Sequence, residues 1–100
     1  MATENITKVR KNTKIQAPKM WNVVFLNDDV TPMDLVIDIL ITIFNHGHDS
    51  AKEITLKIHT EGKAVAGTYS YQISEQKALE ATELARKNRS PLKINLEEVK

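Results

Sequence analysis

Residues 21–33 read WNVVFLNDDVTPM, an apolar run that passes through three polar residues into the start of a helix. The apolar character is nearly continuous from Met20 to Leu26, which predicts a strand buried on both of its faces. A carboxamide and two adjacent carboxylates follow at a strand-to-helix junction, a place where chains commonly expose functional groups. The candidate residues that this stretch supplies are Asn27, Asp28 and Asp29.

The helix after this junction is predicted to begin at Pro32, with Thr31 as its N-cap. Proline suits the first helical position because no amide donor is needed there. Apolar residues then recur at the spacing of one broad helical face to about residue 45. This helix start requires none of the three preceding polar residues, so we interpret them as available for binding.

The rest of the chain alternates between helical and extended patterns. Ser50 and Glu53 form an S-x-x-E capping box, which predicts a second helix to about residue 60. A strand, a helix and a last strand are then predicted over residues 63–73, 74–88 and 92–97. We therefore predict an α+β fold, a β-α-α-β-α-β sandwich whose three-stranded antiparallel sheet packs on three helices.

The composition is that of one small domain and excludes several classes of protein. The 100 residues are 41% apolar and 27% charged and include no cysteine, which excludes disulfides and cysteine-based zinc sites. No apolar stretch approaches the roughly 20 residues of a membrane span, and the N-terminus lacks the apolar core of a signal peptide. We expect a cytoplasmic monomer.

Charge is distributed unevenly along the chain. Residues 1–20 carry five Lys or Arg against Glu4 alone, whereas the remaining residues carry a small net negative charge. A basic arm suggests nucleic acid, so an RNA- or ribosome-associated binding module is an alternative function. The body has no basic stripe, however, and we expect a solvated, flexible extension over residues 1–19 and a core domain over residues 20–100.

Signals for catalysis and for metal binding are weak. Phosphate-binding glycine loops, the H-E-x-x-H zinc pattern and the G-x-S-x-G serine elbow are all missing. His46 and His48 are better explained as a polar helix terminus. Asp28 and Asp29 with His59 resemble a cation site, but zinc and iron sites normally need three protein ligands in register. An Asx-rich turn that caps the next helix remains a structural explanation for the two carboxylates.

Recognition of a primary amine fits the same residues better. Asn27, an ionised Asp28 and a neutral His59 offer three acceptors, which matches the three donors of an ammonium group. An apolar wall beside them would come from the two predicted helices: Thr31, Met33, Val36, Thr55 and Ile58. Such a site suits an amine that carries a hydrophobic side chain, and it needs neither a catalytic residue nor a cofactor.

Two motifs carry a resemblance to a known family. Residues 27–33 have the form N-D-D-x-T-P-M, and residues 59–67 have the form H-x-x-G-K-x-x-x-G. Together with residues 85–88 and 90–92, they resemble the ClpS adaptor family over about residues 20–97. The resemblance implies the predicted fold and a non-enzymatic adaptor of the N-end rule pathway. Such adaptors bind N-terminal Leu, Phe, Tyr or Trp (N-degrons) and deliver substrates to a Clp AAA+ unfoldase and its peptidase.

The resemblance also implies roles by position. The α-amino group of the substrate would be held by Asn27, Asp28 and His59, with Asp29 in contact with the peptide near that end. The pocket lining would include Thr31, Met33, Val36, Ile58 and Leu92. Met33 matches a methionine that helps exclude β-branched first residues, and residues 1–19 match an extension used during delivery. No cofactor, nucleic acid or membrane is implied, and the compartment would be the bacterial cytosol or its equivalent in a plastid or phage-infected cell.

Two positions depart from the family pattern. Thr55 stands where a pocket methionine is common, so we expect an altered preference among large first residues. Gln72 stands where a glutamate that contacts the unfoldase is common, whereas the accompanying lysine is kept as Lys77. The partner would be the N-terminal domain of a ClpA- or ClpC-like unfoldase, and the change at Gln72 leaves open which of these it is.

Overall fold

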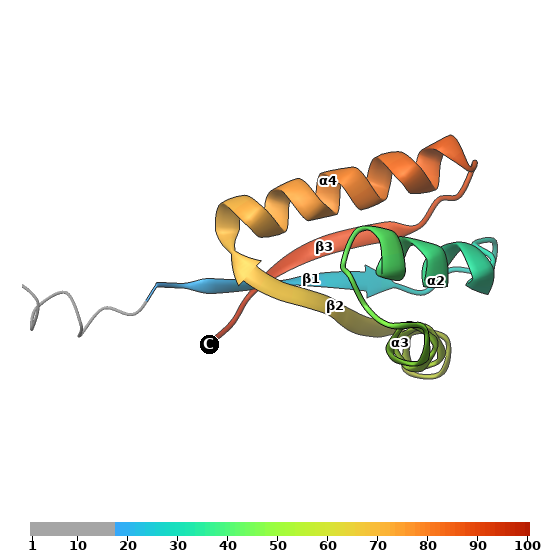
Figure 1. Ribbon diagram of the computed structural model, residues 1–100, viewed down its shortest axis with the longest axis horizontal. Helices are drawn as coiled ribbons and strands as arrows, with labels where there is room; N and C mark the ends of the chain where they lie inside the picture. The colour runs from blue at the N-terminus through green and yellow to red at the C-terminus, as the bar shows by residue number, and fades with distance from the viewer. Residues whose placement is uncertain (1–17) are drawn as a thin grey trace, which may run out of the picture.

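Strand β1 is the central strand of the sheet (Figure 1). The computed structural model describes residues 18–100, so the predicted extension over residues 1–19 lies almost wholly outside the described residues. The elements are, in order, β1 (Met20–Leu26), α2 (Met33–Thr42), α3 (His48–Glu61), β2 (Lys63–Ser70), α4 (Tyr71–Lys87) and β3 (Lys93–Glu98). The strand order is β2-β1-β3 and both pairings are antiparallel, which confirms the predicted α+β fold.

The central position of β1 explains its nearly continuous apolar sequence. Phe25 and the two preceding valines are at most 1% exposed, as predicted for a strand covered on both faces. Val23 and Phe25 belong to the core that the helices complete. Val24 points to the other face of the sheet. There it lines a pocket together with Lys63 and Glu97, which form an ion pair whose charged atoms are 3.5 Å apart.

All three helices share a single core with one face of the sheet. In Figure 1, α4 runs along the sheet, whereas α2 and α3 lie at the end where β1 finishes. Ala81 and Ala85 of α4 are fully buried. Small side chains at these positions allow the helix backbone to approach the strands closely. Within residues 18–100, none of the helices has both the length and the apolar character that crossing a bilayer requires.

A bulge in β2 alters the predicted alternation of that strand. Val23 of β1 pairs with Gly67 and Val24 pairs with Val65, so Ala66 is an extra residue. Up to the bulge, Ala64 and Ala66 are buried, and after it Tyr69 is partly buried against the core. A Cβ atom at Gly67 would collide with the Tyr69 ring, which would then have to move.

The boundary between β2 and α4 lies earlier than the sequence pattern indicated. The predicted strand extended to residue 73, but β2 ends at Ser70 and Tyr71 already belongs to α4. The buried Ser74 hydroxyl donates to the Trp21 carbonyl at 2.9 Å, which fixes the first turn of α4 against β1. Trp21 also meets the Tyr71 ring edge to face, with centroids 5.1 Å apart. These tertiary contacts start α4 three residues earlier than the sequence pattern predicted.

Two predicted helix caps are wrong. The residue that flanks α2 is Pro32, in an extended conformation, and the Thr31 hydroxyl makes no cap bond. Helix α3 begins at His48 after Gly47, ahead of the predicted capping box. The Ser50 hydroxyl lies instead 3.1 Å from Nδ1 of His46. In both cases the hydroxyl contacts another side chain and not the backbone of the helix that it was predicted to cap.

Candidate functional site

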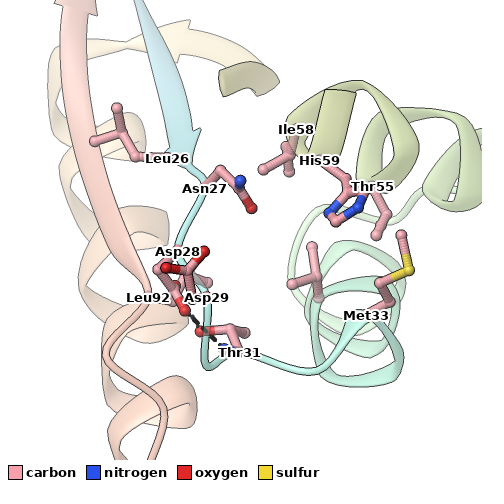
Figure 2. A pocket seen from close by; sticks show the side chains of 11 residues that line it. Leu26, Asn27, Asp28, Asp29, Thr31, Met33, Thr55, Ile58, His59 and Leu92 are labelled. Atoms are coloured by element: carbon pink, nitrogen blue, oxygen red, sulfur yellow. Dashed lines mark hydrogen bonds between the residues drawn. The ribbon is translucent and has the colours of Figure 1, made fainter. Parts of the chain in front are cut away.

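A cavity of about 220 Å³ opens where β1, α2, α3 and the segment before β3 meet (Figure 2). Its lining is Leu26, Asn27, Asp28, Asp29, Thr31, Met33, Val36, Thr55, Ile58, His59 and Leu92. The fold thus brings together every residue predicted to bind the peptide or to line the pocket. It also adds Leu26, the last residue of β1, which the sequence pattern assigned only to the strand. The cavity is smaller than the roughly 300–1,000 Å³ of sites for drug-sized ligands, and its size suits one large side chain.

Asp28 is the most constrained polar residue of the cavity. Its Oδ1 accepts hydrogen bonds from the backbone N–H groups of Val30 and Thr31, both at 2.7 Å. Its Oδ2 accepts from the Thr31 hydroxyl, also at 2.7 Å. The two carboxylates were interpreted as free of structural duties, and for Asp28 that interpretation is wrong. The open alternative, an Asx turn, describes its local geometry, although the turn precedes α2 and does not cap it.

These contacts keep Asp28 ionised. Partial burial raises the pKa of the carboxyl group, but the Thr31 hydroxyl, the amides of Thr31 and Val30 and the charge of Arg86 together lower it. The net pKa lies below the ordinary value of 3.8. A carboxylate offers about four acceptor positions, of which the loop uses three. Asp28 therefore retains its negative charge and one acceptor position on Oδ2.

Asn27 lines the cavity from the end of β1, and His59 lines it from α3. In Figure 2 the Asn27 carboxamide and the His59 ring extend into the space between the end of β1 and α3. Both residues are exposed, and within residues 18–100 neither side chain has a hydrogen-bond partner. The main chain holds them in place, because the Asn27 N–H donates to the Gly62 carbonyl at 2.9 Å. Gly62 has φ +92°, a left-handed conformation that ends α3 just after His59.

The interior of the cavity is apolar. Val36, Ile58 and Leu92 are at most 5% exposed, whereas Met33 is 40% exposed at the rim. Thr55 is 4% exposed, and its hydroxyl donates to the Ala51 carbonyl at 2.7 Å. Since a hydroxyl has one proton, Thr55 has none left for a ligand. The predicted pocket wall is therefore a buried surface with a short residue at position 55.

The side chains considered as metal ligands have other positions and contacts in the structure. Within the described part of the chain, no group of three His, Cys, Asp or Glu side chains is placed to hold a metal ion. His46 contacts the Ser50 hydroxyl through Nδ1 and the Ala66 carbonyl through Nε2, so both of its ring nitrogens serve the fold. Asp29 is exposed at the mouth of the cavity.

Gln72 and Lys77 lie on α4, outside the cavity lining. Gln72 is exposed in the first turn. The Lys77 ammonium group donates to the Ile43 carbonyl at 2.9 Å. It also lies 5.9 Å from the centroid of the Phe44 ring and 5.3 Å from that of Tyr69. Lys77 thus ties the C-terminal end of α2 to α4, and any contact with a partner would be a second role.

Comparison with known proteins identifies a family. The model of the family described as ATP-dependent Clp protease adaptor protein ClpS matches residues 16–95. The ClpS protein of Vibrio atlanticus strain LGP32 is 46% identical over 90 residues, which cover 90% of this chain and 85% of the relative. The ClpS protein of Shewanella pealeana is 42% identical over 98 residues, which cover 96% of each chain.

A solved structure agrees with these relatives. The structure of Agrobacterium tumefaciens ClpS2 bound to L-phenylalaninamide superimposes with a TM-score of 0.80 at 34% sequence identity. The match covers 83% of this chain and 100% of the ClpS2 chain. Sequence and fold lead to the same assignment, and the chain belongs to the ClpS family of ATP-dependent Clp protease adaptor proteins.

Proposed function

We propose that the cavity binds the N-terminal residue of a substrate protein and that the chain delivers this protein to a Clp AAA+ unfoldase for degradation. The observation that carries the proposal is the placement of three acceptor groups at the mouth of an apolar cavity sized for one side chain. The ligand of Agrobacterium ClpS2, L-phenylalaninamide, has the matching chemistry. It combines an α-ammonium group, a benzyl side chain and an amide in the place of a peptide bond.

The acceptors fit the ammonium group in number and in charge. Asp28 supplies an ionised carboxylate with one acceptor position left, and Asn27 and His59 supply side chains that have no hydrogen-bond partner among residues 18–100. Charge-assisted hydrogen bonds contribute about 1.5–3 kcal/mol each. Burial of a Leu or Phe side chain contributes about 1.5–3 kcal/mol more, less the cost of ordering the peptide. We expect a Kd of about 1 μM.

The cavity selects the first residue of the substrate by size and shape. Its depth among Val36, Ile58 and Leu92 favours the large side chains of Leu, Phe, Tyr and Trp. Met33 stands at the rim, where it disfavours side chains branched at Cβ, and Asp29 contacts the peptide just outside. The chain acts as a binding protein without catalytic residues.

Delivery uses a different surface. The exposed face of α4 around Gln72 and Lys77 docks on the N-terminal domain of a ClpA- or ClpC-like unfoldase, with the chain acting as a cytoplasmic monomer. Gln72 is solvent-exposed, which makes it available to a partner. The face lies outside the lining of the cavity, so substrate and unfoldase bind at the same time.

A peptide titration tests the proposal. A fluorescent peptide that begins with Phe is compared with the same peptide acetylated at its N-terminus. Acetylation removes the charge and two of the three donors, so we expect affinity to fall by at least about 100-fold. A peptide that begins with Val serves as the control for the apolar cavity and is expected to bind weakly. Equal affinity of the free and the acetylated Phe peptide would contradict the proposal.

A further inference from the structure

Ser90 is a buried polar residue that touches the cavity only through another side chain. It lies between α4 and β3, it is 3% exposed, and it does not line the cavity. Its Oγ atom is 2.6 Å from the Oγ1 atom of Thr31, which lies 59 positions earlier in the sequence. The backbone N–H of Leu92 donates to the same Ser90 oxygen at 3.1 Å. Ser90 therefore connects the segment before β3 to the Asp28 loop.

The donor and the acceptor of each hydrogen bond in this series follow from the two groups at its ends, Asp28 and the Leu92 N–H. The ionised Asp28 carboxylate only accepts, so the Thr31 hydroxyl must donate to Oδ2. Thr31 has no second proton, and its bond with Ser90 must be donated by the Ser90 hydroxyl. Ser90 in turn accepts from Leu92, whose N–H is a donor only. One orientation thus runs from Leu92 through Ser90 and Thr31 to Asp28.

Other hydrogen bonds hold the backbone around Ser90. The Ser90 N–H donates to the Ala85 carbonyl at 2.9 Å. The Arg86 guanidinium donates to the carbonyls of Ser90 and Leu92 at 2.8 and 2.9 Å. These bonds fix the position from which the Ser90 hydroxyl reaches Thr31. Ser90 therefore donates from a fixed position, whereas the Thr31 hydroxyl that it orients belongs to the loop before α2.

We propose that Ser90 is a positioning residue for amine recognition: by donating to Thr31 it directs the threonine proton onto Asp28 and leaves one defined acceptor position for the ligand. The inference rests on the proposed function of the cavity. Successive hydrogen bonds of one orientation polarise one another, which strengthens the last bond of the chain. Loss of the Ser90 hydroxyl would leave the Thr31 oxygen and the Leu92 N–H without a partner and would free the threonine hydroxyl to rotate.

The test compares two buried serines, Ser74 in the first turn of α4 and Ser90 just after its last turn. Ser90→Ala removes the proposed donor, and Ser74→Ala is the matched control because Ser74 is fully buried and its hydroxyl donates to the carbonyls of Trp21 and Tyr69, away from the cavity. We expect Ser90→Ala to weaken binding of the free Phe peptide about five- to tenfold. We expect Ser74→Ala to lower stability without changing affinity. Ser90→Thr, which keeps the hydroxyl, is expected to restore part of the binding.

Two further measurements separate positioning from a purely structural role. If Ser90 acts through Thr31, then Ser90→Ala should add no further loss of affinity in a Thr31→Val background. NMR titration of the free protein should show a higher pKa for Asp28 in Ser90→Ala than in the wild type, because the Thr31 hydroxyl helps to lower it. Should Ser90→Ala fail to fold, Ser90→Cys replaces it, since a thiol is only a weak donor.

The outcomes are distinct for the two proposals. Wild-type affinity in Ser90→Ala, or an equal loss with and without Thr31→Val, would overturn the positioning role. If the wild type binds the free and the acetylated peptide alike, the proposed function fails, and the Asp28 titration alone then decides whether the hydrogen-bond chain is oriented as described.

Discussion

On one side of the cavity, the loop of residues 28–31 and the segment of residues 90–92 are joined by hydrogen bonds; we call them the loop wall. On the other side, α2 and α3 present Met33, Val36, Thr55, Ile58 and His59; we call these the helix wall. In the loop wall, the side chains of Asp28, Thr31 and Ser90 bond to one another and to the backbone. In the helix wall, the Thr55 hydroxyl bonds to its own helix, and the His59 ring has no hydrogen-bond partner among the described residues. The difference indicates that, under the proposed function, the fold fixes the side chain of the charged acceptor, whereas only the main chain positions His59.

The largest expected effect comes from breaking the loop wall at its charged end. Asp28→Asn removes the negative charge and places an amide donor against the Thr31 hydroxyl or the backbone amides. We expect affinity for the free Phe peptide to fall more than about 100-fold, measured by fluorescence anisotropy. Asp38→Asn, an exposed change on α2 outside the cavity, is the control and should bind normally. Tight binding by Asp28→Asn would remove the carboxylate from the recognition scheme.

The two walls should also differ in how much one lost acceptor costs. His59→Ala removes the imidazole acceptor from the helix wall and leaves Asp28 ionised, because the pKa of Asp28 lies below its ordinary value. We expect affinity for the free Phe peptide to fall about tenfold, less than in Asp28→Asn, measured by the same anisotropy titration. Wild-type affinity in His59→Ala would remove His59 from the recognition scheme.

A smaller change is expected in the helix wall at Thr55. Thr55→Met fills the space beside Met33, so the larger ring of Trp should lose affinity relative to Leu by about three- to tenfold. The control is Thr60→Met, because Thr60 makes the same type of bond to the carbonyl four residues earlier but is exposed and outside the cavity. Titrations with Leu, Phe, Tyr and Trp peptides give the ranking. The same ranking in wild type and Thr55→Met would show that position 55 does not select among large residues.

The smallest effect concerns stability in acid. The pKa of Asp28 in the folded protein is lower than the ordinary value of 3.8, so the carboxylate contributes stability that is complete above pH 3.8. This contribution is lost as the pH falls through the lowered pKa. Urea unfolding between pH 5 and 2 should therefore show a steeper acid loss in the wild type than in Asp28→Asn. Parallel curves would mean that the loop contacts of Asp28 add no net stability.

Local patterns predicted the elements of the fold and, together with the family resemblance, the members of the cavity except Leu26. The continuous apolar run of β1 and the adjacency of Asn27 and Asp28 are local features, and the structure places both as expected. His59 lines the cavity, and its spacing within a motif is also a local feature. The peptide-binding roles of these residues remain predictions.

The features that the sequence did not predict depend on distant contacts. No role was predicted for the Ser90 side chain, because its partner Thr31 lies 59 positions away. The Thr31 hydroxyl was assigned to a helix cap, whereas it donates to Asp28 and bonds with the distant Ser90. The bulge at Ala66 and the early start of α4 arise from pairing with β1 and from the bond between Ser74 and Trp21, which no pattern within β2 indicates.

The main-chain bond between Asn27 and Gly62 has a consequence for how such a site diversifies. It extends the pairing of β1 and β2, in which Leu26 faces Lys63, by one further step. The separation between the Asn27 and His59 backbones is thus fixed by the ladder and by the end of α3, independently of any side chain in the cavity. Under the proposed function, evolution or protein engineering can therefore replace the lining residue by residue and change which side chain is accepted, while the main-chain geometry around Asn27 and His59 is inherited unchanged.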